Sequence, residues 1–158
     1  MLVGSKNNCA EALARSTGKS RAEFVSLMNA KAKIFGLART RFVEPAGVSA
    51  QNVSTAAEMA VIAREAFKKN DIYKASTTKK FSLYAGTTGN EYNVVSTSAA
   101  LLDRDLNITG TKTGHIDGSG YNLVTQARTG SRELIALVLG ADENKNVEEV
   151  YKLLKKYL

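Results

Sequence analysis

The sequence predicts an α+β chain in which helices come first, antiparallel strands follow, and a helix ends the chain. Two segments, Ser20-Arg-Ala-Glu23 and Thr55-Ala-Ala-Glu58, have the form of helix capping boxes, and apolar residues at helical spacing follow each of them. The apolar stretches between residues 108 and 140 are separated by glycine-containing turns, which is typical of a strand meander. Helices grouped ahead of strands are typical of the α+β class.

The helical part is predicted to contain a helix over Asn7–Ser16, a second that follows Ser20 and ends at Gly36, and a third that follows Thr55 and stops at Asn70. The spacing of apolar residues within these helices predicts that each has an apolar face that packs against the rest of the chain. The residues expected on these faces are Cys9, Ala12 and Leu13, then Phe24, Leu27, Met28, Ile34 and Phe35, then Met59, Ile62, Ala63, Ala66 and Phe67.

The sheet part is predicted to contain strands over 108–116, 121–128 and 132–140, followed by a helix over 142–157. In that last helix the residues expected to face inward are Val147, Val150, Tyr151, Leu154 and Leu158. Residues 71–107 carry the weakest pattern, and predict only a loop over Tyr84–Asn90 between short extended pieces.

Composition limits the classes of function that are open to the chain. Lys plus Arg is 22 and Asp plus Glu is 15, a net charge of +7 that favours polyanionic surroundings without choosing among them. There is no Trp and no block of five like charges, so a dedicated nucleic-acid surface is not indicated. A single Cys and a single His exclude an internal disulfide framework and most metal sites, so we expect no metal and no cofactor.

Two short motifs contain the candidate catalytic residues. Ser5-Lys6-Asn7 begins the first predicted helix, and Lys112-Thr113-Gly114 lies in the first strand of the meander. Each string alone is weak, but Ser-x-Asn followed by Lys-Thr-Gly is the order found in active-site-serine β-lactamases and penicillin-binding proteins.

Longer stretches around the motifs strengthen the match, and the chain resembles the low-molecular-mass penicillin-binding proteins, which are serine-type D-alanyl-D-alanine carboxypeptidases. The resemblance implies a β-lactamase/transpeptidase-like fold, incomplete at the N-terminus, in which residues 1–158 form one partial domain with a mainly helical part over 1–75 and a mainly sheet part over 76–158. The stretches that carry it are Leu2–Ala14, Phe24–Asn29, Arg41–Gly47, Ser54–Ala60, Gly110–Asp117, Gly120–Val124 and Leu134–Gly140.

The resemblance implies acyl transfer through a serine ester, with the D-Ala-D-Ala end of a peptidoglycan stem peptide as the substrate. Ser5 would relay a proton, the amide of Asn7 would orient substrate and lysine, and Lys112 would place positive charge near the terminal carboxylate of the substrate. By the same resemblance, the Thr113 hydroxyl would bind that carboxylate and Gly114 would let the substrate backbone lie along the strand.

The resemblance also implies that the backbone N–H of His115 is one donor of an oxyanion hole. It places the protein outside the cytoplasmic membrane, although Met1–Gly4 shows no signal peptide and no apolar run is long enough to span a bilayer.

The family's nucleophile motif, Ser-x-x-Lys, should precede Ser5. Two strings have these letters, Ser16-Thr-Gly-Lys19 and Ser76-Thr-Thr-Lys79, but both follow Ser5 and we do not expect either to be the nucleophile. We therefore expect the chain to be the C-terminal part of a longer catalytic domain, inactive alone, that would bind β-lactams only if a complementing N-terminal segment supplied the nucleophile.

Other interpretations remain open at this stage. Cys9 would be a nucleophile paired with His115, or His115 would belong to a Ser-His-Asp triad with Asp117. Glu44 would be a deacylating acid like that of class A β-lactamases; we weigh each of these below the carboxypeptidase interpretation. A D,D-endopeptidase is a close alternative to the carboxypeptidase. A non-catalytic peptidoglycan- or partner-binding remnant of the fold is the alternative from outside the enzymes.

Overall fold

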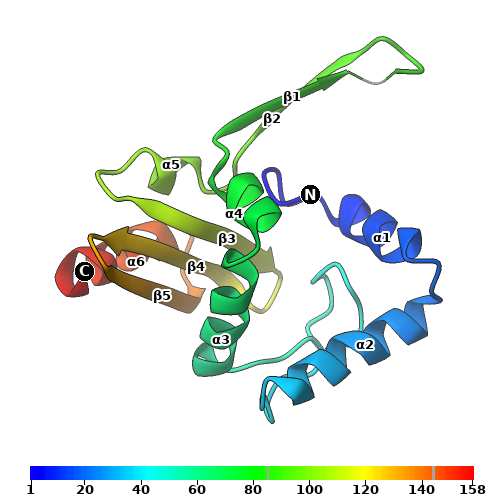
Figure 1. Cartoon of the computed structure of the whole chain (residues 1–158), viewed down its shortest axis with the longest axis horizontal. Helices are drawn as coiled ribbons and strands as arrows, with labels where there is room; N and C mark the ends of the chain where they lie inside the picture. The colour runs from blue at the N-terminus through cyan, green and yellow to red at the C-terminus, as the bar shows by residue number, and fades with distance from the viewer. Residues whose placement is uncertain (85, 144) are drawn as a thin grey trace.

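The computed structural model describes residues 1–84, 86–143 and 145–158, and its elements follow the predicted order of helices, strands and a final helix (Figure 1). The elements are α1 (Asn7–Ser16), α2 (Arg21–Ile34), α3 (Ala56–Phe67), α4 (Asn70–Thr77), β1 (Lys80–Tyr84), β2 (Glu91–Val95), α5 (Ala99–Leu102), β3 (Ile108–Ile116), β4 (Gly120–Thr129), β5 (Arg132–Ala141) and α6 (Lys145–Tyr157).

The three strands β3, β4 and β5 form one antiparallel sheet in the order β3-β4-β5, so among the described residues no strand pairs with the outer edge of β3. Helix α6 packs behind this sheet, while α3 and α4 lie in front of it (Figure 1). The core lies between the sheet and α6, and its largest fully buried apolar side chains are Leu101, Leu123, Val150 and Leu154. The predicted meander and its closing helix are therefore present as expected.

The front face of the sheet is closed by α3, and Gly110 makes that contact possible. A Cβ atom at Gly110 would collide with the ring of Phe67, the last residue of α3. The register of β3 against β4 shifts between Ile108 and Gly110, which re-aims the strand at this point.

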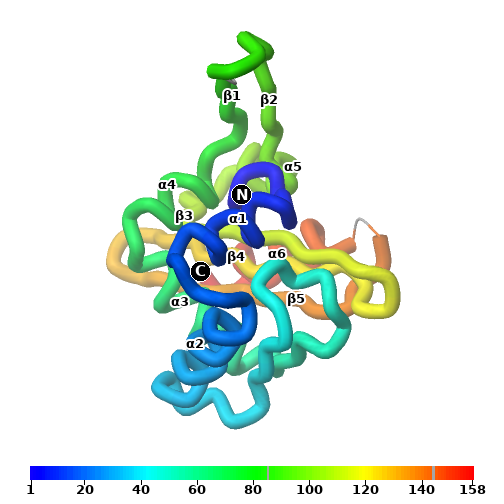
Figure 2. Tube along the Cα trace, turned by 90° about the vertical axis from the view of Figure 1, so that its right-hand side faces the viewer, coloured from blue at the N-terminus to red at the C-terminus, as the bar shows by residue number. Residues whose placement is uncertain are grey.

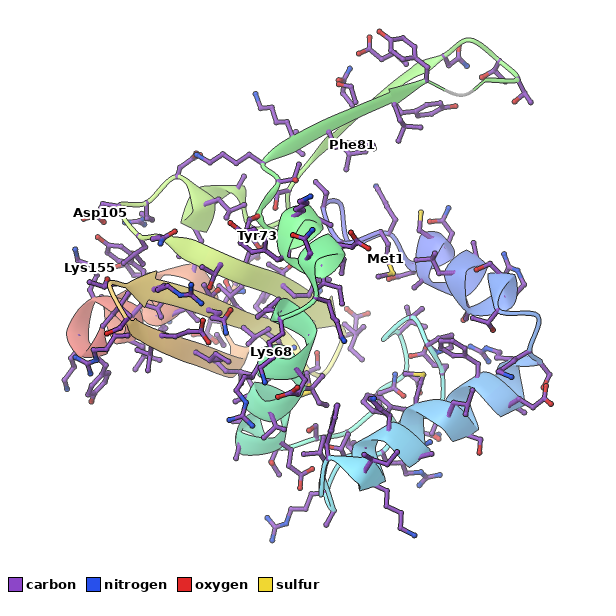
Figure 3. The ribbon with its side chains drawn as sticks, in the orientation of Figure 1. Met1, Lys68, Tyr73, Phe81, Asp105 and Lys155 are labelled. Atoms are coloured by element: carbon purple, nitrogen blue, oxygen red, sulfur yellow. The ribbon has the colours of Figure 1, made fainter. Side chains whose placement is uncertain are left out.

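Strands β1 and β2 form a separate antiparallel hairpin that projects from the body of the molecule (Figures 1 and 2). Its aromatic side chains are exposed, including Phe81 (Figure 3). The sequence pattern predicted extended pieces here but neither the hairpin register nor α4 and α5. Position 85, within the predicted loop, lies outside the described residues.

Two details of the helical prediction are wrong. The Thr55 hydroxyl accepts the Glu58 N–H as a cap should, but the Glu58 carboxylate accepts the Arg39 N–H and the Thr40 hydroxyl instead of reaching back to Thr55. The residues expected on the apolar faces of α1 and α2 are also not buried: some are half-buried, and Leu13 and Ile34 are 56% and 74% accessible. Among the described residues, no helix combines the length and apolar character needed to span a bilayer.

Candidate active site

The two predicted motifs meet in space. The Lys112 ammonium group on β3 donates a hydrogen bond to the Ser5 hydroxyl at 2.6 Å and another to the carbonyl of Thr113. These residues are 107 positions apart in the chain, so the contact is a product of the fold. The front face of β3 therefore carries a lysine–serine pair beside the free edge of the sheet.

Ser5 is held at this place by a tight turn at the start of the chain. Its φ of 48° lies in the left-handed region, which is uncommon for a residue with a side chain and is often found where a site needs a particular backbone shape. The Lys6 N–H donates to the Met1 carbonyl, and the Val3 carbonyl accepts the Thr97 N–H at 3.1 Å. The turn is thus tied to the segment that leads into α5.

The charge of Lys112 is the main electrostatic feature of the site. Burial lowers the pKa of Lys112 from its ordinary value, because the charged form loses solvation. In the described part of the chain no carboxylate forms an ion pair with it. An anionic ligand at the strand edge would be the first partner of opposite charge for this ammonium group.

The remaining predicted residues lie along β3 or at the start of α1. The Thr113 hydroxyl donates to the hydroxyl of Thr97 at 2.6 Å. Gly114 and His115 are exposed, and the imidazole of His115 stacks on Tyr121 with ring centroids 4.1 Å apart. Asn7 is the first residue of α1 and its side chain is exposed; its amide forms no hydrogen bond within the described residues.

A groove continues from the end of β3. It has a volume of about 580 Å³, and its walls are the β3 end on one side and the segment from Phe42 to Ser54 on the other. A Cβ atom added at Gly114 would meet only the Cβ of Asn122, at 3.9 Å, so packing within the chain does not require glycine there. Open space at Gly114 fits a strand edge that another backbone approaches closely.

Comparison with known proteins decides the family. The family model for D-alanyl-D-alanine carboxypeptidase matches residues 1–143. The chain belongs to this family.

The relatives that the chain matches are longer than the chain itself. The chain is 34% identical over 157 residues to the D-alanyl-D-alanine carboxypeptidase DacD of Escherichia coli, a match that covers 98% of this chain and 39% of the relative. It is 36% identical over 124 residues to a D-alanyl-D-alanine endopeptidase of Haemophilus influenzae, covering 78% of this chain and 42% of the relative. The chain thus spans about two fifths of the length of these relatives.

Solved structures support the fold. A D-alanyl-D-alanine carboxypeptidase from Mycobacterium tuberculosis superposes with a TM-score of 0.82 at 24% identity, covering 99% of this chain and 61% of that one. A penicillin-binding protein from Listeria monocytogenes, in its cefotaxime-bound form, gives 0.81 at 24% identity and covers 99% of this chain and 62% of that one. The penicillin-recognising α+β fold expected from the sequence is confirmed.

Sequence reasoning missed some residues of this carboxypeptidase-family site. Thr97 connects the Ser5 turn to Thr113, yet it lies in the stretch whose pattern was weakest. The amide of Asn122 accepts the Gly140 N–H at 2.9 Å and holds the floor of the groove. Only the longer matching stretch Gly120–Val124 hinted at Asn122, and nothing in the sequence singled out Thr97.

The alternative sites are not assembled among the described residues. Cys9 is half-buried on α1, and His115 contacts Tyr121, not Asp117. The Glu44 carboxylate accepts a set of backbone N–H groups in its own loop, which occupies the lone pairs a general base would need. No group of three or more potential metal ligands occurs in the part of the chain that the structure describes.

Neither Ser-x-x-Lys string resembles a nucleophile site in the structure. Ser16 ends α1 and its hydroxyl donates to the Leu13 carbonyl at 2.8 Å. Ser76 is buried in α4, where its hydroxyl donates to the Tyr73 carbonyl at 3.1 Å, while Lys79 pairs with Asp103.

Proposed function

We propose that this chain is part of a serine D,D-carboxypeptidase that removes the terminal D-alanine from peptidoglycan stem peptides. Its own task in that enzyme is to bind the D-Ala-D-Ala end. The observation that supports the proposal is the Lys112–Ser5 pair beside the free edge of β3, which offers positive charge and a hydroxyl next to an unpaired strand. A short peptide with a free carboxylate matches both features.

In the proposed reaction a serine hydroxyl attacks the carbonyl carbon of the penultimate D-alanine. The peptide C–N bond breaks, the terminal D-alanine leaves with a proton on its nitrogen, and the shortened stem stays attached as a serine ester. Water then hydrolyses the ester, which restores the serine and releases the stem as a carboxylate. The proposal places the nucleophile in a Ser-x-x-Lys segment of the parent enzyme.

The residues of this chain would act on the bound peptide in separate ways. Lys112 and the Thr113 hydroxyl hold the terminal carboxylate, while the Ser5 oxygen, already bound to the ammonium group, passes a proton to the leaving nitrogen. Asn7 orients the peptide, and the His115 N–H donates to the oxyanion that forms during attack; losing one such donor typically costs about 10²- to 10³-fold in rate.

A titration of this chain with acetyl-D-Ala-D-Ala, followed by NMR, tests the binding role. We expect shifts at Lys112–His115, and we expect Lys112→Met to weaken binding at least about tenfold, since a hydrogen bond to a charged group contributes about 1.5–3 kcal/mol. Lys155→Met is the matched control, because it removes an exposed lysine on α6. Equal affinities of both variants for the peptide, or no binding to the wild-type chain, would contradict the proposal.

Labelling with fluorescent penicillin tests where the nucleophile lies. We expect no covalent label on this chain and stoichiometric label on the parent enzyme, at a serine that precedes Ser5. Covalent label mapped by mass spectrometry to Ser16 or Ser76 would overturn this part of the proposal. The same experiment on intact and lysed cells reports location, which we propose to be outside the cytoplasmic membrane.

Endopeptidase activity is the second candidate, because a relative at 36% identity carries that name. The parent enzyme should be offered a stem pentapeptide and a D-Ala-cross-linked dimer in parallel. Faster release of D-alanine from the pentapeptide supports the carboxypeptidase, whereas faster cleavage of the dimer supports the endopeptidase. A parent that binds both peptides and cleaves neither would be the non-catalytic form of the fold.

A further inference from the structure

A second cavity lies on the front face of the sheet, at the end where β4 turns into β5. It has a volume of about 320 Å³, and none of its residues belongs to the candidate active site. Two residues of its outer wall, Lys68 and Tyr73, are labelled in Figure 3. The sheet contributes Thr109, Gln126, Arg128 and Glu133, and the junction of α3 with α4 contributes Phe67, Lys68, Asn70 and Tyr73.

The strand register places this cavity on the same face as Lys112. Gln126 pairs with Gly110 of β3, and Lys112 lies two residues beyond Gly110, so all three positions share one face of the sheet. The ring of Phe67 packs on Gly110 and covers β3 between the cavity and Lys112. Thr109 is three residues before Lys112, which is roughly 10 Å along a strand. The cavity is therefore separate from the candidate active site but lies beside it.

The floor of the cavity is a chain of hydrogen bonds that fixes its polar groups. The Thr109 hydroxyl donates to the side-chain carbonyl of Gln126 at 2.9 Å, and the Gln126 amide donates to the Glu133 carboxylate at 2.9 Å. The second oxygen of that carboxylate accepts from Arg128 at 2.7 Å. Gln126 is 4% accessible, so its side chain cannot turn without breaking both of its bonds. The cavity is therefore preformed, as a site for a small ligand usually is.

The charges at the cavity are paired with one another. Arg128 bonds Glu133 at 2.7 Å, and Lys68 bonds Glu65 at the same distance. Each pair is partly exposed and adds little to stability, but it neutralises the charge that a ligand meets. An anion would compete with the two carboxylates for the two cations, and a cation would face the reverse competition. The cavity thus favours an uncharged ligand.

Polar groups without a partner in the described part of the chain complete the lining. The amide of Asn70 and the hydroxyl of Tyr73 form no hydrogen bond there, and Arg128 has N–H donors beyond the one that bonds Glu133. Tyr73 is 40% accessible, so its ring also offers an apolar surface. A sugar ring has an apolar face of C–H groups and a rim of hydroxyls. An aromatic ring among amide, guanidinium and carboxylate groups matches both.

We propose that this cavity binds an uncharged sugar ring, and that the ring is an N-acetylhexosamine of a peptidoglycan glycan strand. The second part rests on the proposed function, because it takes peptidoglycan to be the substrate polymer. A stem peptide that pairs antiparallel with β3, with its carboxylate at Lys112, runs toward Ile116 and away from Thr109. The sugar therefore belongs to a strand other than the one that carries the bound stem. The cavity thus holds a neighbouring strand beside the site of cleavage.

NMR titration of the wild-type chain with N,N′-diacetylchitobiose, an uncharged disaccharide of N-acetylglucosamine, tests the inference. We expect saturable shifts of the side-chain amides of Asn70 and Gln126 and of the Tyr73 ring. Saturating acetyl-D-Ala-D-Ala should leave the affinity for the disaccharide unchanged, because the two sites are separate. Absence of disaccharide binding, competition between the two ligands, or stronger binding of inorganic phosphate at these residues would each overturn the inference.

Tyr73→Ala tests the role of the aromatic ring. We expect it to weaken disaccharide binding on the order of fivefold, the effect of losing one aromatic contact, and to leave the affinity for acetyl-D-Ala-D-Ala unchanged. The matched control is Tyr157→Ala, because Tyr157 is 50% accessible on α6 and lies outside the cavity. This control should bind the disaccharide as tightly as the wild-type chain does.

A second variant keeps the inference falsifiable if Tyr73→Ala does not fold. Asn70 is exposed and lines the cavity, so Asn70→Ala removes a polar group of the site without disturbing the core. It should weaken disaccharide binding about two- to tenfold, as expected for one lost hydrogen bond. Full affinity for the disaccharide in either folded variant overturns the inference and leaves the proposed function intact. A wild-type chain that binds the disaccharide but not acetyl-D-Ala-D-Ala retains the sugar site, but it contradicts the proposed function and, with it, the assignment of the sugar to peptidoglycan.

Discussion

The sheet with α6 and the helix pair α1–α2 both have apolar residues at the spacing of their elements, but the two regions differ in how these residues pack. In the first region all the predicted inward residues pack on the core: Val150 and Leu154 are fully buried, while Val147, Tyr151 and Leu158 are half-buried. In the second region only Ala14 and Ala32 are buried within the helices, while Leu27 is 50% accessible. Periodicity identifies an apolar face, but burial of that face also requires a complementary surface to pack on.

The largest expected effect comes from truncating one apolar side chain in each of the two regions. Leu154→Ala should lower the free energy of unfolding by about 3 kcal/mol, because it leaves a cavity in the core beneath the sheet. Ile34→Ala, the same kind of truncation at a position 74% accessible, should cost less than about 0.5 kcal/mol. Urea unfolding of the two variants measures both values. A cost for Ile34→Ala close to that of Leu154→Ala would show that α2 is covered in solution.

Two glycines on β3, Gly110 and Gly114, provide a second comparison between a packed and an open position. Gly110→Ala forces a methyl group against the ring of Phe67 and should cost about 1–3 kcal/mol, because an overpacked contact strains its neighbours. Gly114→Ala meets only Asn122 and should change the free energy of unfolding by less than about 0.5 kcal/mol. For peptide affinity the order of the two effects should be reversed, because Gly114→Ala blocks the approach of a peptide backbone to β3. Equal stability of the two variants would contradict the packing described for α3.

The elements that the sequence predicted well carry strong local signals. The helix over 7–16 and the strand over 108–116 have the predicted bounds, and the Ser20 capping box is present in full. Helix α4 was missed because it begins at Asn70, where the preceding helix was expected to stop and no new apolar period is evident. The β1–β2 hairpin was expected only as short extended pieces, although polar and apolar residues alternate over 80–83 and 91–94. Its register was missed because a local pattern does not say which residues of the two strands pair.

The candidate site depended on a different kind of information. No rule of spacing brings residue 5 next to residue 112, and only the resemblance of the two motifs to a known family suggested that they meet. The structure shows the Lys112–Ser5 contact, while the catalytic roles of these residues stay proposals. The Glu44 loop was recognised only as a turn, because a local pattern does not reveal that one carboxylate binds successive backbone N–H groups.

The smallest expected effect is a difference in pKa between a lysine in the candidate site, Lys112, and a lysine on the surface, Lys155. Burial lowers the pKa of Lys112, whereas hydrogen bonding to Asp105 and the charge of that carboxylate raise the pKa of Lys155 on exposed α6 (Figure 3). NMR titration of the lysine Cε resonances should therefore place Lys112 below Lys155.

The sign of the linked stability follows from the direction of each shift. Because the folded-state pKa of Lys112 lies below its unfolded value, the folded chain binds fewer protons there in alkaline solution, and its contribution to stability increases as pH rises between the two values. The contribution of Lys155 has the opposite sign: it is complete below the unfolded pKa and is lost as pH rises through the folded one. Co-titration of the two resonances would mean that water reaches the Lys112 ammonium group as freely as it reaches the surface, and the site would then lack the poorly solvated charge that we assign to carboxylate binding.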